Sequence, residues 1–129
     1  MIAELPPRII LLVDDAEDCI DTLDVALQPL PGVSILSAAT AEAALAILTR
    51  ETISAVITDL QLPVMSGLEL IAAIREQARY RWLPIVAISA AAAPEAAHAA
   101  LSCGADAFFP KPFSPSVLRK KLEELLYAG

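Results

Sequence analysis

The chain has 129 residues, of which 57% are hydrophobic, and its formal net charge is −7. This length suits one domain with a substantial core, so we expect a single domain over residues 1–129 with its core at about 8–126. The acidic balance argues against direct nucleic-acid binding, which needs a basic surface. Since no segment reaches the roughly 18 to 20 apolar residues of a membrane span and the start lacks the pattern of a secretory signal, we expect no membrane association and a cytoplasmic location.

Five short apolar segments predict β-strands, and five longer segments between them predict helices. The expected strands are residues 8–13, 33–37, 55–58, 84–88 and 107–109. The expected helices are residues 17–27, 41–50, 68–77, 95–103 and 115–127. Short, almost continuously apolar strands that alternate with helices are typical of a parallel sheet covered on both faces. The sequence therefore predicts an α/β fold with a doubly wound, five-stranded parallel sheet.

Residues at the ends of these helices support the boundaries. Thr40 and Ser114 are well placed as N-caps, because their side-chain oxygens can accept hydrogen bonds from the first turn of a helix. Gly104 suits a left-handed C-terminal cap after the fourth helix. The two cysteines, Cys19 and Cys103, lack the C-x-x-C spacing of redox or metal sites, and we expect both to be reduced thiols.

Polar or charged residues follow four of the expected strands closely: Asp14 and Asp15, Asp59, Ser89, and Lys111. In an open parallel sheet the carboxyl ends of the strands share one edge, and ligands bind outside that edge. We therefore expect three carboxylates, one hydroxyl and one ammonium group to converge on one pocket. These groups suit a hard cation and a phosphoryl group better than an organic cofactor. The three acids and one lysine leave a net charge of −2, which Mg²⁺ would neutralise.

Four stretches of the sequence together resemble the receiver domain of bacterial two-component response regulators, in particular the chemotaxis regulators. They are LLVDD at residues 11–15, TDLQLPVMSG at 58–67, the Ser89–Ala90 pair, and GADAFFPKPF at 104–113. The resemblance covers nearly the whole chain. It implies a flavodoxin-like fold with strand order 2-1-3-4-5 and five helices.

The resemblance also implies a chemistry for the pocket. Asp59 would be the phosphoacceptor, whose carboxylate attacks phosphorus to give an aspartyl phosphate. Mg²⁺ would be the cofactor, held by Asp15, by Asp14 mainly through water, by Asp59 and by the backbone carbonyl of Gln61. Because Mg²⁺ prefers octahedral oxygen ligation and keeps several waters, such a ligand set is chemically suitable. The domain would catalyse only its own phosphorylation and dephosphorylation.

Two further residues would complete the site, and two would respond to it. Lys111 and Ser89 would stabilise the charge of the transferring phosphoryl group. Ser89 and Phe108 would then move as a conformational switch. The family also suggests a cis peptide bond between Lys111 and Pro112. The expected partners are a histidine kinase or phosphotransfer protein, and an output partner or second copy on the face formed by residues 95–103, 107–109 and 115–127.

Other interpretations of the same residues remain open at this stage. A phosphohydrolase of the haloacid dehalogenase type also phosphorylates an aspartate, but it needs a second aspartate at the position of Gln61. A degenerate receiver could serve as a constitutive protein-binding module, although the five polar positions of the pocket are all intact. A flavodoxin relative is disfavoured because Asp14 and Asp15 stand where a phosphate would need hydrogen-bond donors.

Overall fold

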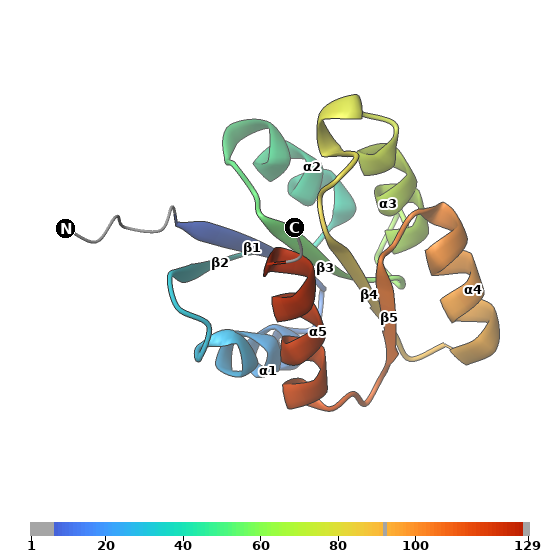
Figure 1. Cartoon of the computed structure of the whole chain (residues 1–129). Coiled ribbons are helices and arrows are strands. Elements are labelled where there is room, and N and C mark those ends of the chain that lie inside the picture. The colour runs from blue at the N-terminus through green and yellow to red at the C-terminus, as the bar shows by residue number, and fades with distance from the viewer. Residues whose placement is uncertain (1–6, 92, 128–129) are drawn as a thin grey trace.

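The computed structural model describes residues 7–91 and 93–127. In that part of the chain, strands and α-helices alternate five times, and one short 3₁₀ helix is added (Figure 1). The strands are β1 (Arg8–Val13), β2 (Val33–Ala38), β3 (Ala55–Asp59), β4 (Ile85–Ser89) and β5 (Ala107–Pro110). The helices are α1 (Glu17–Leu27), α2 (Ala41–Arg50), α3 (Gly67–Arg75), the 3₁₀ helix η1 (Ala78–Tyr80), α4 (Ala93–Cys103) and α5 (Pro115–Tyr127).

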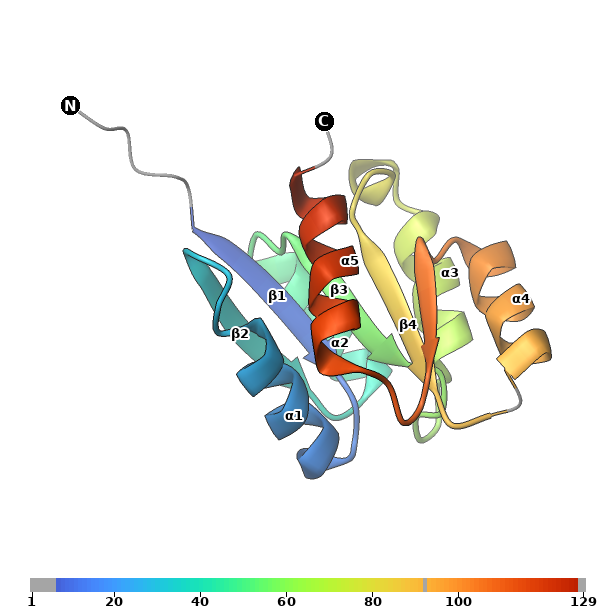
Figure 2. The ribbon, with the colours of Figure 1, turned by 60° about the horizontal axis from the view of Figure 1, so that its bottom comes forward.

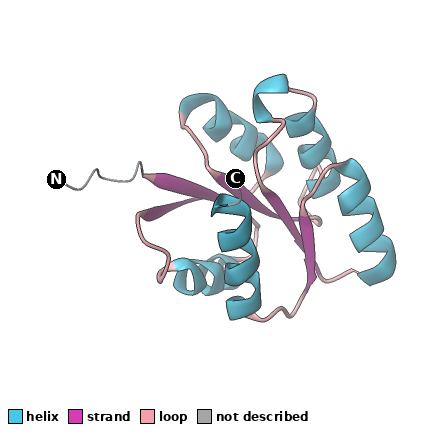
Figure 3. Cartoon of the chain, in the orientation of Figure 1, coloured by secondary structure: helices cyan, strands magenta, loops and turns pink. Residues whose placement is uncertain are grey.

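The five strands form one parallel sheet in the order β2-β1-β3-β4-β5, which confirms the predicted fold class and strand order. The helices connect strands whose carboxyl ends all lie at the same edge of the sheet (Figure 3). β3 and β4 are buried along their whole length, as expected of central strands with both faces covered.

Helices cover both faces of the sheet, and each face has its own apolar core. α1 and α5 lie on one face, where Leu23 and Leu118 pack against Ile10 and Ile57 of the sheet (Figure 2). α2, α3 and α4 lie on the other face with a larger buried cluster that includes Ile71. Each strand therefore sends alternate side chains to two cores.

The helix ends follow the local chemistry of the sequence. The Thr40 side chain accepts a hydrogen bond from the first turn of α2, and Ser114 does the same for α5, as predicted. Gly104 ends α4 with φ +117. An unpredicted capping box formed by Ser66 and Glu69 starts α3 one residue earlier than expected. The peptide bond before Pro112 is cis, as the resemblance suggested.

Two helix ends differ from the expectation by two residues. α4 begins at Ala93 instead of residue 95, and α3 stops at Arg75, where a separate 3₁₀ turn follows. The Arg75 guanidinium donates to the carbonyl oxygens of Gly104 at 2.9 Å and Tyr80 at 2.8 Å, and to the Asp106 carboxylate at 3.1 Å. That carboxylate also accepts a bond from the amide of Ile85, the first residue of β4. One arginine thus joins α3, η1 and the loop before β5. Among the described residues, no helix has the length and apolar character needed to cross a membrane.

Candidate functional site

The carboxyl edge of the sheet brings together residues from four strands. Asp14 follows β1, and its amide donates to Ala38 of β2 at 3.0 Å. Asp59 is the last residue of β3 and lies opposite Ile88 of β4. Lys111 follows β5, and its amide donates to the Ser89 carbonyl at 2.8 Å. Ser89 therefore lies between the ends of β3 and β5, and all these residues are at one edge, as the sequence predicts.

The centre of the site is the Lys111 ammonium group, which contacts two buried carboxylates. Its Nζ atom lies 2.6 Å from Asp59 Oδ2 and 3.0 Å from Asp14 Oδ2. Asp59 is 5% exposed and Asp14 is 3% exposed. Burial alone would lower the pKa of Lys111, but hydrogen bonds and charge attraction from Asp59 and Asp14 outweigh burial and raise this pKa above its ordinary value. Lys111 therefore stays cationic, and one positive charge compensates two negative ones.

The second oxygen of each carboxylate is held by a backbone amide. Asp59 Oδ1 accepts from the amide of Gln61 at 2.8 Å, and Asp14 Oδ1 accepts from the amide of Ala16 at 2.9 Å. Both bonds span two residues, a local turn typical of aspartate. They fix the orientation of the carboxylates and place the backbone of Gln61 beside Asp59.

Ser89 is fully buried, and its hydroxyl oxygen accepts a hydrogen bond from the Ala91 amide at 3.0 Å. A hydroxyl that accepts in this way still has its own hydrogen to donate. Ser89 can therefore serve as a donor at the edge where Asp59 lies.

Asp15 lies outside the contact between Lys111 and the two buried carboxylates. It is exposed, and it lines an open hollow of about 380 Å³ together with Asp14, Glu17 and Asp21. Among residues 7–91 and 93–127, no three acidic, histidine or cysteine side chains lie in an arrangement that could hold a metal ion. The structure thus brings together Asp14, Asp59 and Lys111 and places Asp15 at the rim.

Two residues lie at the site although the sequence analysis did not place them there. Gly67 approaches the backbone so closely that a Cβ atom there would lie 2.6 Å from the Cα atom of Leu60 and would overlap the carbonyl oxygen of Asp59. Cys19, on α1, lies against Asp14. The pKa of the Cys19 thiol is raised to about 12, mainly by burial. The hydrogen bond to Asp14 and the negative charge of Asp14 contribute to the same rise in pKa. Only the glycine had a signal in the sequence, namely its place in the turn after Asp59.

Phe108, the expected switch residue, is half-buried on β5 and packs against the core cluster on the face covered by α2, α3 and α4. Ala96 and Cys103 of α4 contact the same cluster. β5 is in contact with α4, and Phe108 precedes Lys111 by only three residues.

Comparisons with known proteins agree with this geometry. The family model of the response regulator receiver domain matches residues 10–123. A chemotaxis protein CheY homolog of Campylobacter jejuni is 32% identical over 121 residues, which cover 93% of each chain. Among solved structures, a response regulator from Chloroflexus aurantiacus has a TM-score of 0.87 at 29% identity, covering 94% of this chain and 98% of its own. The chemotaxis response regulator CheY4 of Vibrio cholerae has a TM-score of 0.83 at 30% identity, covering 93% and 99%. The matches do not favour a phosphohydrolase.

Proposed function

The chain belongs to the response regulator receiver domains, signalling modules of two-component systems, and on that premise we propose that Asp59 accepts the phosphoryl group. The observation that carries this proposal is the bridge from Lys111 to Asp59 and Asp14, because it fixes a nucleophilic carboxylate beside a permanent cation. We take residues 1–129, with a core at about 8–126, as one receiver domain that works in the cytoplasm with a histidine kinase or phosphotransfer protein.

Each residue of the site would have a separate part in the transfer. An oxygen of Asp59 forms a bond to phosphorus while the bond from phosphorus to the nitrogen of the donor histidine breaks. Lys111 pairs with one phosphoryl oxygen, and the Ser89 hydroxyl donates to another. Both groups are held before the reaction starts, so they stabilise the spreading charge without reorganisation of solvent. Hydrolysis of the acyl phosphate would later regenerate Asp59.

Receiver domains typically bind Mg²⁺ at the phosphorylation site, and the donors present here fit that ion. Two buried carboxylates share one ammonium group, and Asp14 and Asp15 line the same hollow, so the site has an excess of negative charge and oxygen ligands. We propose Asp14, Asp15, Asp59 and the carbonyl oxygen of Gln61 as the magnesium ligands, which would have to gather around the ion as it binds, since among the described residues no three acidic side chains already lie in a metal-binding arrangement. Bound Mg²⁺ would neutralise charge on the carboxylates and on the phosphoryl oxygens.

The signal would leave through the face made by α4, β5 and α5. Ser89 joins the site to β5 through its bond from Lys111, and Phe108 on β5 packs beside α4. Ala96, Ala97 and Ala99 of α4 are half-buried, and their short side chains give this helix a smooth surface. We propose that phosphorylation moves Ser89 and Phe108 and changes this face, where an output partner or a second copy docks.

The proposed site can be tested with a small phosphodonor. Acetyl phosphate with Mg²⁺ should add one phosphoryl group to the chain, detected by intact mass, and chelation of the metal should prevent labelling. Asp59→Asn should abolish labelling, whereas Asp24→Asn, an exposed acid on α1, should leave it unchanged. Mg²⁺ binding itself, measured by calorimetry without phosphodonor, should weaken in Asp15→Asn. Persistent labelling of Asp59→Asn would show that another residue is the acceptor.

A further inference from the structure

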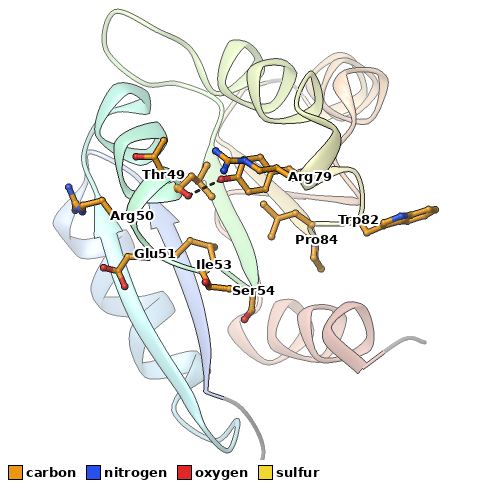
Figure 4. Close-up of a pocket in the computed structure, with 12 residues that line it drawn as sticks. Thr49, Arg50, Glu51, Ile53, Ser54, Arg79, Trp82 and Pro84 are labelled. Atoms are coloured by element: carbon orange, nitrogen blue, oxygen red, sulfur yellow. Dashed lines mark hydrogen bonds between the residues drawn. The ribbon is translucent and has the colours of Figure 1, made fainter.

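A second hollow lies at the amino edge of the sheet, the edge opposite Asp59. It has a volume of about 530 Å³ and is lined by the end of α2, the loop that leads into β3, and the segment from η1 to β4 (Figure 4). Ile53 and Leu83, both buried, and Pro84 give it an apolar floor. Ser54 precedes β3 and Asp59 ends it, so the five steps of extended chain put about 17 Å between this hollow and the phosphoacceptor.

Aromatic side chains form one side of this hollow, which we call the amino-edge hollow. Tyr80 is fixed there by a hydrogen bond from its hydroxyl to the Leu48 carbonyl at 2.8 Å, and the Arg79 guanidinium lies 4.7 Å from the centre of its ring. Trp82, the only tryptophan of the chain, is 88% exposed and reaches outward from the rim (Figure 4). Tryptophan, tyrosine and arginine are the residues that dominate binding energy at protein interfaces.

The charge of the amino-edge hollow is opposite to that of the whole chain. Arg50 and Arg79 line it, Arg81 is exposed next to Trp82, and Glu51 is the one acid among the lining residues. Within residues 7–91 and 93–127, none of these three arginines takes part in an ion pair, unlike Arg75. A chain with a net charge of −7 thus carries a local positive surface around an apolar floor. This combination is complementary to carboxylates that flank an apolar side chain.

We propose that the amino-edge hollow is a docking site for an acidic segment of a partner protein. One bulky apolar side chain of that segment packs against Ile53 and Leu83, and its neighbouring carboxylates pair with Arg50 and Arg79. The amino-edge hollow is open to solvent on one side, which suits a bound peptide segment better than an enclosed small ligand. Because the hollow is far from Asp59, docking here is independent of phosphorylation and can hold a partner near the domain in both signalling states.

The test starts from short random peptides displayed on phage and selected on the full chain. The enriched peptides should be acidic and carry a bulky apolar residue. A synthetic peptide from this set should change the fluorescence of Trp82 on titration. Arg79→Glu should raise the Kd of the peptide at least about 30-fold, since charge reversal at a central arginine removes an attraction and adds a repulsion. Glu51→Gln should strengthen binding, and Asp59→Asn should leave it unchanged.

Lys120→Glu is the matched control, because it makes the same charge change at an exposed position on α5. Circular dichroism would verify that both charge-reversal variants are folded. The proposal is overturned if no acidic peptide is enriched, or if Arg79→Glu and Lys120→Glu have the same Kd. It is also overturned if Asp59→Asn abolishes binding, or if a single-stranded oligonucleotide displaces the peptide with equal affinity, since the site would then be a general polyanion surface.

Discussion

Replacement of Gly67 by alanine should damage the site more than the fold. Gly67 starts α3, and its amide donates to the Leu60 carbonyl at 2.9 Å. A Cβ atom at this position would lie 2.6 Å from the Leu60 Cα atom and 2.9 Å from the carbonyl carbon of Asp59. Both neighbours are backbone atoms, so neither can rotate away as a flexible side chain would. The backbone beside Asp59 has to move instead.

The size of the effect follows from that displacement. Ordinary carbon contacts require about 3.5 Å, so the backbone must shift by close to 1 Å beside Asp59, the proposed nucleophile. A misplacement of that size can cost about a hundredfold in rate. Overpacking costs about 1–3 kcal/mol of unfolding free energy, partly offset by the better helix propensity of alanine, which is worth up to about 1 kcal/mol. We expect Gly67→Ala to lose about 1–2 kcal/mol of stability and about a hundredfold in labelling rate.

Urea unfolding and acetyl phosphate labelling would measure the two effects separately. Gly32→Ala is the matched control, because Gly32 has φ +71 but no atom within 4 Å of its added Cβ. That variant should lose about 1–2 kcal/mol through its backbone conformation alone and keep the labelling rate. If Gly67→Ala labelled as fast as Gly32→Ala, the close approach of α3 to Asp59 would not control the geometry of the nucleophile.

Three further predictions concern other parts of the molecule. Arg75→Ala should lower the free energy of unfolding by about 2 kcal/mol, because it removes the hydrogen bonds from one guanidinium to the carbonyls of Gly104 and Tyr80 and to the Asp106 carboxylate; Lys120→Ala should change it little, and equal unfolding midpoints would exclude the role given to Arg75. Val64 is 96% exposed with φ +65, which is strained for a β-branched residue, so Val64→Asn should raise stability by about 1 kcal/mol in urea unfolding; no increase would mean that the turn imposes no strain. Cys19 should resist alkylation by iodoacetamide at pH 8–9, because its pKa is raised to about 12 and its thiolate forms only above that range. Asp14→Asn should speed its alkylation, while the rate at the other cysteine serves as the reference; an unchanged rate would show that Asp14 does not hold the thiol protonated.

The fold was predictable from sequence because its signals are local. The strand at Arg8–Val13 is apolar from its second residue onward, and the helix at Ala41–Arg50 begins at a threonine cap, so both boundaries agree with the expectation. The end of α3 was not predictable in the same way. Helix-favouring residues continue past Arg75 to Gln77, but the guanidinium of Arg75 binds carbonyls 5 and 29 residues further along the chain. A contact of that kind depends on the folded arrangement.

The site shows the same division between local and long-range information. Positions after the strands predict which residues share the carboxyl edge, since parallel strands end together. They do not predict which carboxylates the Lys111 ammonium group contacts, because that depends on how far the Lys111 side chain extends in the folded protein. Lys111 pairs with Asp14, 97 residues away, and with Asp59, 52 residues away, while Asp15 remains exposed next to Asp14.

This sharing of charge also explains why the site suits a switch. A buried ion pair costs desolvation energy that its own attraction barely repays, and here one ammonium serves two buried carboxylates. The excess negative charge at this edge of the sheet destabilises the folded state relative to a chain with apolar residues at the same positions. It is also the charge that a divalent cation would neutralise, and the cation in turn would favour the arrival of a phosphoryl group. Because Lys111 lies three residues after Phe108, any movement of its ammonium from a carboxylate to a phosphoryl oxygen would act on the end of β5. The residues that make the site costly to fold would thus be those that connect its proposed chemistry to the surface beside α4.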